Sequence, residues 1–280
     1  TCPENFIMLN DQFRMEPDIA NIANIYYGEY GGLSSDALEK SEERAKEQDE
    51  FYKWYPGKEQ DRNIHLIDTE SLHTWVTGVS QGTHHSRFNC FSAAVDVELA
   101  FKLLERKSAK ADSSEASVLI VAPYKPHVEK IKQLIELEYK NRGLPKNSND
   151  IQAGTIHSFQ GREADIVIFD LVIDEPHWRA GLFLDGNNYK EYNDDLRKMF
   201  NVAITRAKFK LFIVGNFSYC QKKAKNNALA ELLNTLLNRY NLPKIDAKSI
   251  LPDLVFSQNT VVSTDQAPGS CTLCREDTFD

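Results

Sequence analysis

The stretch SVLIVAPYKPHVEKIKQLIELEY, residues 117–139, decides the fold class of this chain. Its first part, Val118 to Ala122, is a continuous apolar run that ends at Pro123, which is typical of a strand buried on both faces. Its second part, Pro126 to Tyr139, has the periodicity of an amphipathic helix. A buried strand followed directly by such a helix predicts a parallel sheet with helices packed on both faces.

The same alternation of strand and helix extends to both sides of this stretch. Strands are expected at residues 63–68, 151–156, 165–172 and 210–214, and helices at 17–26, 91–104, 194–208 and 228–240. The mixed-charge run at 39–50 predicts a solvated helix, and residues 74–89 predict an irregular loop. We therefore expect one α/β domain over residues 1–245, with an insertion at about 28–62 and a tail at 246–280.

The amino-acid composition limits the classes of protein to which this chain can belong. The 280 residues are 41% hydrophobic and 26% charged, and no apolar run approaches the length of a membrane helix, so no membrane is expected. Five cysteines, an odd number, argue against a disulfide framework and favour a reducing, cytoplasmic location. The net charge of −8 disfavours broad electrostatic binding of nucleic acid, but it leaves local contacts through backbone amides open. The chain opens without Met, so we expect a fragment of a longer protein.

Two short patterns could suggest a metal, and neither is complete. His84 and His85 have no acidic or cysteine ligand at a tight spacing beside them. Cys271 and Cys274 form a lone CxxC, which lacks the two further ligands of a zinc site. No metal site is therefore expected.

One arginine falls on the apolar face of the helix expected at 194–208. At about 100° per residue, Arg206 falls inside the apolar sector, between Met199 and Val202. A guanidinium is almost never fully buried without a partner. We therefore expect Arg206 to have an anionic partner or to face a cleft.

Four motifs stand in order along the chain: LNDQFRMEP at 9–17, VAPY at 121–124, GTIHSFQGREAD at 154–165 and DDLRKMFNVAITRAK at 194–208. With these strand and helix contexts, they resemble the later helicase motifs of superfamily 1, in particular the group that includes the nonsense-mediated-decay helicase. The likeness covers about residues 6–216. It implies a RecA-like parallel sheet of the P-loop NTPase type, the second of two motor domains that clamp one ATP and move along a single strand.

The first domain's phosphate loop, GxxxxGK[ST], is missing here, because the Gly-Lys pair Gly57-Lys58 is followed by Glu59. The resemblance therefore implies that ATP and Mg²⁺ are held mainly by a domain outside this sequence, and that the chain alone is inactive. Asp174-Glu175 follows an apolar strand and imitates a Mg²⁺-binding acidic pair. Because this pair comes after the FQGRE turn, where the resemblance places an ordinary strand of the sheet, we favour a structural role for it over Mg²⁺ binding.

The resemblance assigns residues to the nucleotide. Arg14 and Arg206 would reach the γ-phosphate, where an arginine finger stabilises developing charge. Phe13 would stack on the base in place of a tyrosine, or else be a core residue, and Arg206 could instead pair with a carboxylate or the helix macrodipole. The remaining positions implied at this site are Gln12 near the nucleotide, Glu163 on the ribose, and Gln160 and Gly161 in the turn that couples the site to the strand.

The resemblance also assigns residues to single-stranded DNA or RNA. Pro123, Tyr124 and Thr155 would contact the backbone of the strand at strand ends, where parallel sheets gather function. His157 stands where the family frequently has Asp, and His127 where it frequently has Gln. These two differences leave open how the chain would bind the strand and which strand it would prefer. Glu16 stands where His is usual.

The resulting prediction is the C-terminal motor domain of an ATP-dependent superfamily 1 DNA/RNA helicase of the 5′ to 3′ type. Its partners would be a single strand and the N-terminal RecA-like domain. Two alternatives stay open: an inert RecA-like docking module, which a broken upstream phosphate loop would favour, and a self-contained hydrolase that uses Asp174 and Glu175.

Overall fold

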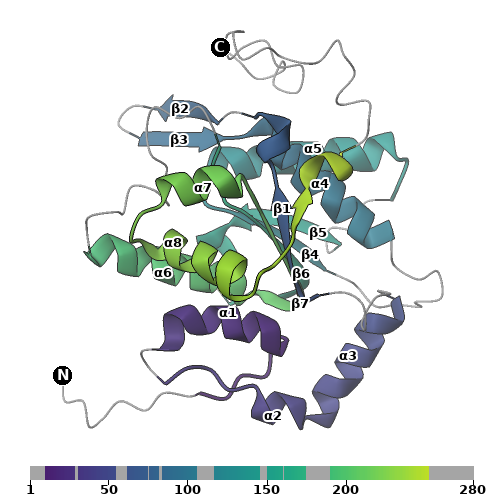
Figure 1. Cartoon of the computed structure of the whole chain (residues 1–280). Coiled ribbons are helices and arrows are strands. Elements are labelled where there is room, and N and C mark those ends of the chain that lie inside the picture. Colours follow the sequence, from purple (N-terminus) through teal and green to yellow (C-terminus); the bar gives the residue numbers. More distant parts are fainter. Residues whose placement is uncertain are drawn as a thin grey trace.

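The computed structural model describes residues 10–28, 31–54, 62–74, 76–81, 84–105, 117–145, 150–159, 161–174 and 190–251. At its centre lies a six-stranded parallel sheet with the strand order β5-β4-β6-β7-β1-β8 (Figure 1). The predicted α/β fold with a parallel sheet is confirmed. The expectations for Gln160, for Glu175, for the Gly57-Lys58 pair and for the CxxC pair fall outside the described residues.

Five of the six strands lie where the sequence predicts them, and the sixth does not. The strands are β1 (Ile64–Asp68), β4 (Val118–Ala122), β5 (Ile151–Thr155), β6 (Ala164–Asp170), β7 (Ala207–Gly215) and β8 (Lys244–Asp246). All three residues of β8 are exposed, so no apolar run marks this edge strand in the sequence. The strand spans the expected boundary at residue 245, and the buried Ile250 and Leu251 follow it.

The sheet separates two hydrophobic cores. One face packs against α1 (Pro17–Tyr27), α6 (Lys190–Ile204), α8 (Ala228–Leu233) and its π-helical continuation Asn234–Arg239. The other face packs against α4 (Cys90–Glu105) and α5 (Lys125–Asn141) (Figure 1). Side chains alternate between the two cores along each strand, as Leu119 and Val121 face the first core and Ile120 the second. The amphipathic helix predicted from Pro126 to Tyr139 is thus α5, and it covers the second core.

The boundary between α6 and β7 differs from the prediction. The helix ends at Ile204 and β7 begins at Ala207, so Arg206 lies in a short turn rather than in the last turn of a helix. The cause is pairing across the sheet: Ala207 is in register with Ala164, whose amide donates to the Arg206 carbonyl at 3.0 Å. The prediction that Arg206 lies on the apolar face of a helix is therefore wrong.

An antiparallel hairpin replaces the irregular loop predicted at 74–89. Its strands are β2 (Thr77–Gln81) and β3 (His84–Phe88). The residues at its base are joined, since Asn89 Nδ2 donates to Thr74 Oγ1 at 3.0 Å. Helix α7 (Phe217–Lys223) follows β7 and lies at the same end of the sheet as the hairpin (Figure 1).

The segment at 36–54 forms α2 (Asp36–Glu39) and α3 (Glu42–Trp54). The prediction of a fully solvated helix at 39–50 is wrong for one face of α3, where Arg44 is only 5% exposed. Phe51 on the same helix stacks on Phe209 of β7 with ring centroids 4.2 Å apart. The inserted helix is therefore packed against the sheet. Within the described residues, no helix combines the length and hydrophobicity needed to cross a bilayer.

A tight contact near the end of β5 leads to a first testable expectation. A Cβ at Gly154 would overlap the ring of Phe159 and lie 2.5 Å from Ser158 Oγ. Gly154→Ala is therefore expected to lower the free energy of unfolding by about 1–3 kcal/mol, the usual cost of overpacking. Urea denaturation of the chain measures it. Gly78→Ala is the control, because nothing lies within 4 Å of its added Cβ; equal stability of the two variants would contradict the expectation.

Candidate functional site

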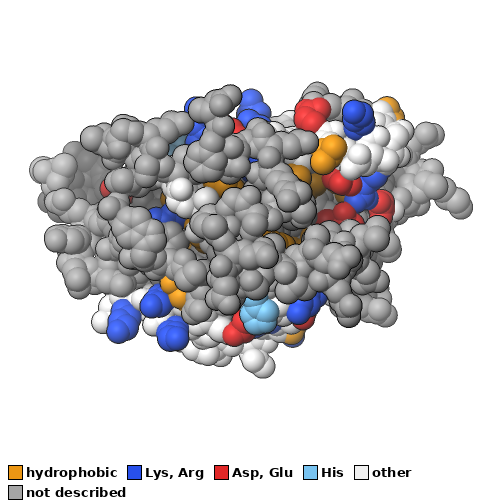
Figure 2. Space-filling model, turned by 90° about the horizontal axis from the view of Figure 1, so that it is seen from above, with side chains coloured by type: hydrophobic (Ala, Val, Ile, Leu, Met, Phe, Trp, Pro, Cys, Tyr) orange, Lys and Arg blue, Asp and Glu red, His pale blue; other side chains and the backbone are white. Residues whose placement is uncertain are grey.

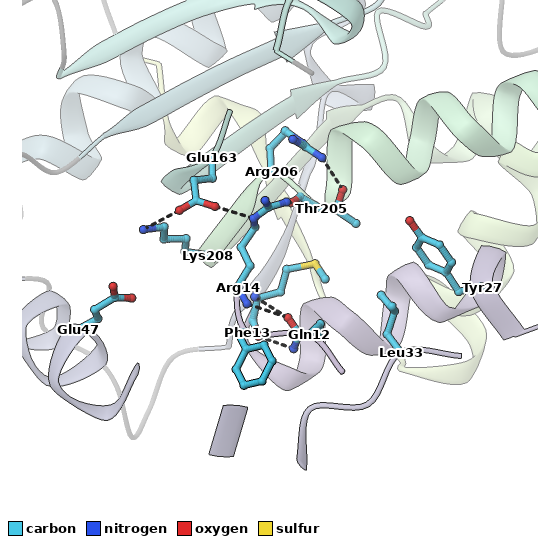
Figure 3. A pocket seen from close by; sticks show the side chains of 11 residues that line it. Gln12, Phe13, Arg14, Tyr27, Leu33, Glu47, Glu163, Thr205, Arg206 and Lys208 are labelled. Atoms are coloured by element: carbon cyan, nitrogen blue, oxygen red, sulfur yellow. Dashed lines mark hydrogen bonds and ion pairs between the residues drawn. The ribbon is translucent and has the colours of Figure 1, made fainter. Parts of the chain in front are cut away.

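A cavity of about 490 Å³ opens at the amino ends of β6 and β7. Its walls come from the segment before α1, from α1, α3 and the α6–β7 turn, and from the residue preceding β6 (Figure 3). The expectation that functional groups gather at the carboxyl ends of the strands is wrong for this cavity. The lining residues are Gln12, Phe13, Arg14, Met15, Tyr27, Leu33, Glu47, Glu163, Thr205, Arg206 and Lys208.

Gln12 shapes the turn that presents the next two residues to the cavity. Its Nε2 donates to Met15 O at 3.0 Å and to Ser35 Oγ at 2.8 Å. Its Oε1 accepts the amides of Arg14 at 3.1 Å and Met15 at 2.9 Å. A glutamine amide has two donors and two acceptor positions, so all are used within the protein. Phe13, beside it, is 59% exposed, which excludes the core-phenylalanine alternative.

Glu163 joins two cations of the cavity. Its Oε2 lies 2.6 Å from Arg14 Nε, and its Oε1 lies 3.0 Å from Lys208 Nζ (Figure 3). Burial opposes ionisation of this carboxyl, but the hydrogen bonds from Lys208 and Arg14 prevail and lower its pKa. Glu163 is thus held as a carboxylate that orients Arg14, whose Nη1 also donates to Thr205 O at 3.2 Å.

Arg206 is 9% exposed and is held by three hydrogen bonds. Its Nε donates to Val202 O at 2.9 Å, Nη1 to Arg162 O at 2.8 Å and Nη2 to Thr205 Oγ1 at 3.2 Å. The bond to Val202 caps the last turn of α6, so the helix-end alternative describes part of its role. None of these partners is a carboxylate. Burial and the nearby Arg14 charge lower the pKa of Arg206.

The two guanidinium groups therefore converge on one cavity from opposite ends of the chain (Figure 3). Thr205, Lys208 and Glu47 also line the cavity, and no role at this site was predicted for them from the sequence. Lys208 follows the TRA motif directly, so its position was a usable signal. Glu47 comes from α3, and nothing in the sequence links that helix to the motifs.

The residues expected to contact a nucleic acid lie at the opposite edge of the sheet. Pro123 and Tyr124 follow β4, and Thr155 ends β5. His157 is exposed in the 3-10 helix Ile156–Phe159, which begins the connection from Thr155 back to the cavity.

The connection from β5 to β6 ends in a tight turn. Gly161 has a φ of +84°, a left-handed conformation that favours glycine. The turn leads directly to Glu163 at the cavity. One short segment thus links the two edges of the sheet.

Figure 2 looks onto the face above the carboxyl ends of the strands. The Lys and Arg side chains coloured on it lie around its margins, with Asp and Glu side chains also visible there. Arg87 of β3 lies over the ring of Tyr124, with 5.2 Å between Cζ and the ring centroid. This contact ties the hairpin to the edge where Tyr124 lies.

His127 is not at this surface but inside the second core. Its Nε2 lies 2.9 Å from Asp170 Oδ2 and 3.7 Å from Asp96 Oδ2, and all three side chains are fully buried. Burial and the neighbouring Asp170 raise the pKa of Asp96, whereas His127 and the Val172 amide hold the pKa of Asp170 down although burial opposes this. The structure therefore gives His127 a role in the core.

Asp96, His127 and Asp170 have a spacing compatible with a metal ion. Metal binding at Nε2 requires a lone pair there and a proton on Nδ1. Here Nδ1 accepts the amide of Asn89 at 3.2 Å, which places the imidazole proton on Nε2, toward Asp170. The geometry therefore fits a buried pair of His127 and Asp170, with Asp96 beside it, and not a metal site.

Asp174 also has a structural role. It is 2% exposed, and its carboxylate accepts hydrogen bonds from Thr69 at 3.2 Å, from Asn216 at 2.8 Å and from Thr74. These contacts tie the base of the hairpin to the ends of β1 and β7. A carboxylate so enclosed is not placed to hold Mg²⁺, which keeps several waters around it.

A family model described as an AAA domain (AAA_12) matches residues 1–218. Three curated relatives are a regulator of nonsense transcripts 1 homolog from Drosophila melanogaster, a DNA polymerase alpha-associated DNA helicase A from Saccharomyces cerevisiae and an RNA helicase Mov10l1 from Mus musculus. Their identities to this chain are 26% over 246 residues, 31% over 108 and 32% over 127, which cover 88%, 39% and 45% of it.

The chain spans only a small part of these relatives, namely 18%, 13% and 10% of their lengths in the same order. A solved structure, the C-terminal domain of a possible DNA helicase from Lactobacillus plantarum, aligns over 83% of this chain and 98% of that one. That alignment has 12% identity and a TM-score of 0.39. Because the family model matches most of the sequence, the chain belongs to this AAA domain family, the C-terminal, second RecA-like domain of superfamily 1 helicases.

Proposed function

We propose that the chain is the C-terminal motor domain of an ATP-dependent helicase, and that Arg14 and Arg206 stabilise the γ-phosphate of an ATP bound between this domain and a first RecA-like domain. The observation that carries the proposal is the convergence of these two side chains on one open cavity from segments far apart in sequence. The family membership supplies the context, since its curated relatives carry helicase names.

The charge of the cavity supports an anionic ligand. Its lining has three cations, Arg14, Arg206 and Lys208, and two carboxylates, Glu47 and Glu163. A guanidinium has five N–H donors, of which Arg206 uses three and Arg14 two in the hydrogen bonds described above. The remaining donors suit a phosphoryl group, whose transition state spreads charge over several oxygens. An anion between the two cations would also relieve their mutual repulsion.

The rest of a nucleotide finds matching groups nearby. Phe13 offers an exposed ring face for the base. Each Glu163 oxygen has one cationic partner and can accept a further hydrogen bond, which suits ribose hydroxyls. Gln12, in contrast, is saturated, so its proposed role is to hold the turn that carries Phe13 and Arg14 rather than to touch the nucleotide.

Mg²⁺ does not fit the residues of this cavity. The Glu163 carboxylate is paired with two cations, and Glu47 is paired with Arg44 at 3.6 Å. We therefore place the Mg²⁺ ligands and the water-activating acid in the first domain. The contribution of this chain is to bind and orient the terminal phosphate.

For the nucleic acid, we propose that a single strand crosses the edge formed by Pro123, Tyr124, Thr155 and His157. Tyr124 and Thr155 are half-buried there and carry hydroxyl groups, and His157 is exposed. Hydroxyl contacts to phosphates are independent of base sequence. The net charge of −8 favours such contacts over a broad electrostatic interaction. The turn at Gly161 would couple this edge to the ATP cavity.

ATP turnover with and without the first domain tests the proposal. We expect background hydrolysis from the 280-residue chain, and hydrolysis stimulated by single-stranded RNA or DNA from a protein that carries both domains. The physical reason is that the chain has the cavity cations but no phosphate loop. A coupled phosphate-release assay measures both proteins.

Two outcomes would contradict the proposal in different ways. Turnover by the chain alone that is lost in Glu175→Gln would establish a self-contained hydrolase. No turnover by the two-domain protein, despite an intact phosphate loop upstream, would establish the docking-module alternative.

A further inference from the structure

A buried ion pair lies directly behind the cavity. Arg44 of α3 places Nη2 2.9 Å from Glu16 Oε1, and the two side chains are 5% and 7% exposed. Gln48, one turn further along α3, donates to both oxygens of Glu16 at 3.1 and 2.9 Å. The guanidinium also lies over the ring of Phe209, with 4.2 Å between Cζ and the ring centroid. Both charges are thus enclosed by packed groups.

Arg44 and Glu16 both contact one backbone carbonyl, that of Lys208. Lys208 O accepts the amide of Glu16 at 2.8 Å and also lies 3.4 Å from Arg44 Nη2. Glu16 is two residues after Arg14, and Lys208 is two residues after Arg206. The Lys208 carbonyl therefore joins the two segments that carry the cavity arginines, and Arg44 lies against that junction.

The side chain of Lys208 extends the link to the cavity itself. Its Nζ pairs with Glu163, and Glu163 holds Arg14 (Figure 3). A displacement of the Lys208 backbone would therefore move the carboxylate that orients Arg14 and the turn that carries Arg206. In catalysis, a misplacement of about 1 Å can cost about 10²-fold in rate.

We propose that Arg44 and Glu16 are positioning residues that set the spacing of Arg14 and Arg206, so that α3 is part of the ATP-hydrolysing machinery. The proposal rests on the function proposed above. It accounts for two features that the sequence left unexplained: an acidic residue at position 16, and a mixed-charge insertion helix. Removal of one member leaves the other charge buried without its partner, and the junction then relaxes.

Steady-state kinetics of the two-domain protein test this role. Arg44→Met keeps an apolar stem over Phe209 but removes the charge. We expect kcat for ATP to fall about 10- to 100-fold, since orientation is lost, while KM changes less than about 3-fold. Glu16→Gln should have a similar effect. The double variant should lose no more than the worse single variant, because the two residues act as one unit.

Lys46→Met is the matched control, because Lys46 is exposed on the same helix. Thermal unfolding followed by circular dichroism confirms that each variant is folded. Should Arg44→Met not fold, Arg44→Lys keeps the charge but loses the planar fork, and a fall in kcat is expected from it too. Wild-type kcat in a folded Arg44→Met or Arg44→Lys protein would overturn the positioning role, provided that Arg206→Ala removes turnover. If Arg206→Ala also leaves turnover intact, the proposed function itself fails.

Discussion

Arg206→Ala is expected to lower the ATP turnover of the two-domain protein by about 10³- to 10⁵-fold, the usual worth of an arginine finger in phosphoryl transfer. The physical reason is the loss of a cation placed where charge spreads in the transition state. Binding of a single strand should be largely retained, because the proposed strand contacts lie at the opposite edge of the sheet. Turnover is measured by phosphate release and strand binding by fluorescence anisotropy.

Arg206 also caps the end of α6, so the structural effect of Arg206→Ala has to be separated from its effect on catalysis. Two further variants do this. Arg14→Ala should lower turnover similarly, and its side chain is 36% exposed and less embedded in the fold. Arg197→Ala, on α6 itself, is the control: this arginine pairs with Glu231 and does not line the cavity. Loss of strand binding with turnover intact in Arg206→Ala would contradict the role assigned to it.

The second large effect concerns the buried pair of His127 and Asp170. Asp170→Asn is expected to lower the free energy of unfolding of the chain by about 1–3 kcal/mol, the cost of leaving a buried donor, here His127 Nε2–H, without its acceptor. Asp170 accepts the Val172 amide at 2.7 Å and faces His127 at 2.9 Å. Urea denaturation at pH 7 measures the loss.

Asp96→Asn supplies the matched comparison at the carboxyl beside this pair. Because burial and the Asp170 charge raise the pKa of Asp96, this group is favoured in its neutral form, which asparagine imitates. A pKa raised in the folded state means that stability is full below the ordinary value of 3.8 and falls as pH rises from there through the raised pKa. Asp96→Asn should remove that loss and be neutral or stabilising at pH 7. Equal destabilisation by the two variants would contradict the assignment.

Much of the fold could be predicted from local sequence alone. The strand at Val118–Ala122 was expected with the bounds that the structure shows, because a continuous apolar run ending at proline has few other solutions. The helix that begins at Pro17 was likewise expected, since its proline suits the first turn. The predicted membership in the superfamily 1 helicase group is confirmed by the family model.

The errors share one physical cause, which is that pairing and burial join residues far apart in the chain. The helical period at 194–204 continues by chance through Lys208, but pairing of Ala207 with Ala164 ends the helix earlier. The hairpin at 77–88 has a polar composition typical of a loop, and only the pairing of its two strands reveals it.

By itself, the sequence determined the order of the buried strands and amphipathic helices, and the motifs that identify the family, because both depend on residue types at short spacing. Only the tertiary structure decided where the arginines lie, what holds them, and that Arg44 and Glu16 stand behind them. It also decided that His127 is a core residue rather than a surface contact. Such facts depend on which distant groups share one low-dielectric environment, and no local pattern in the chain encodes that.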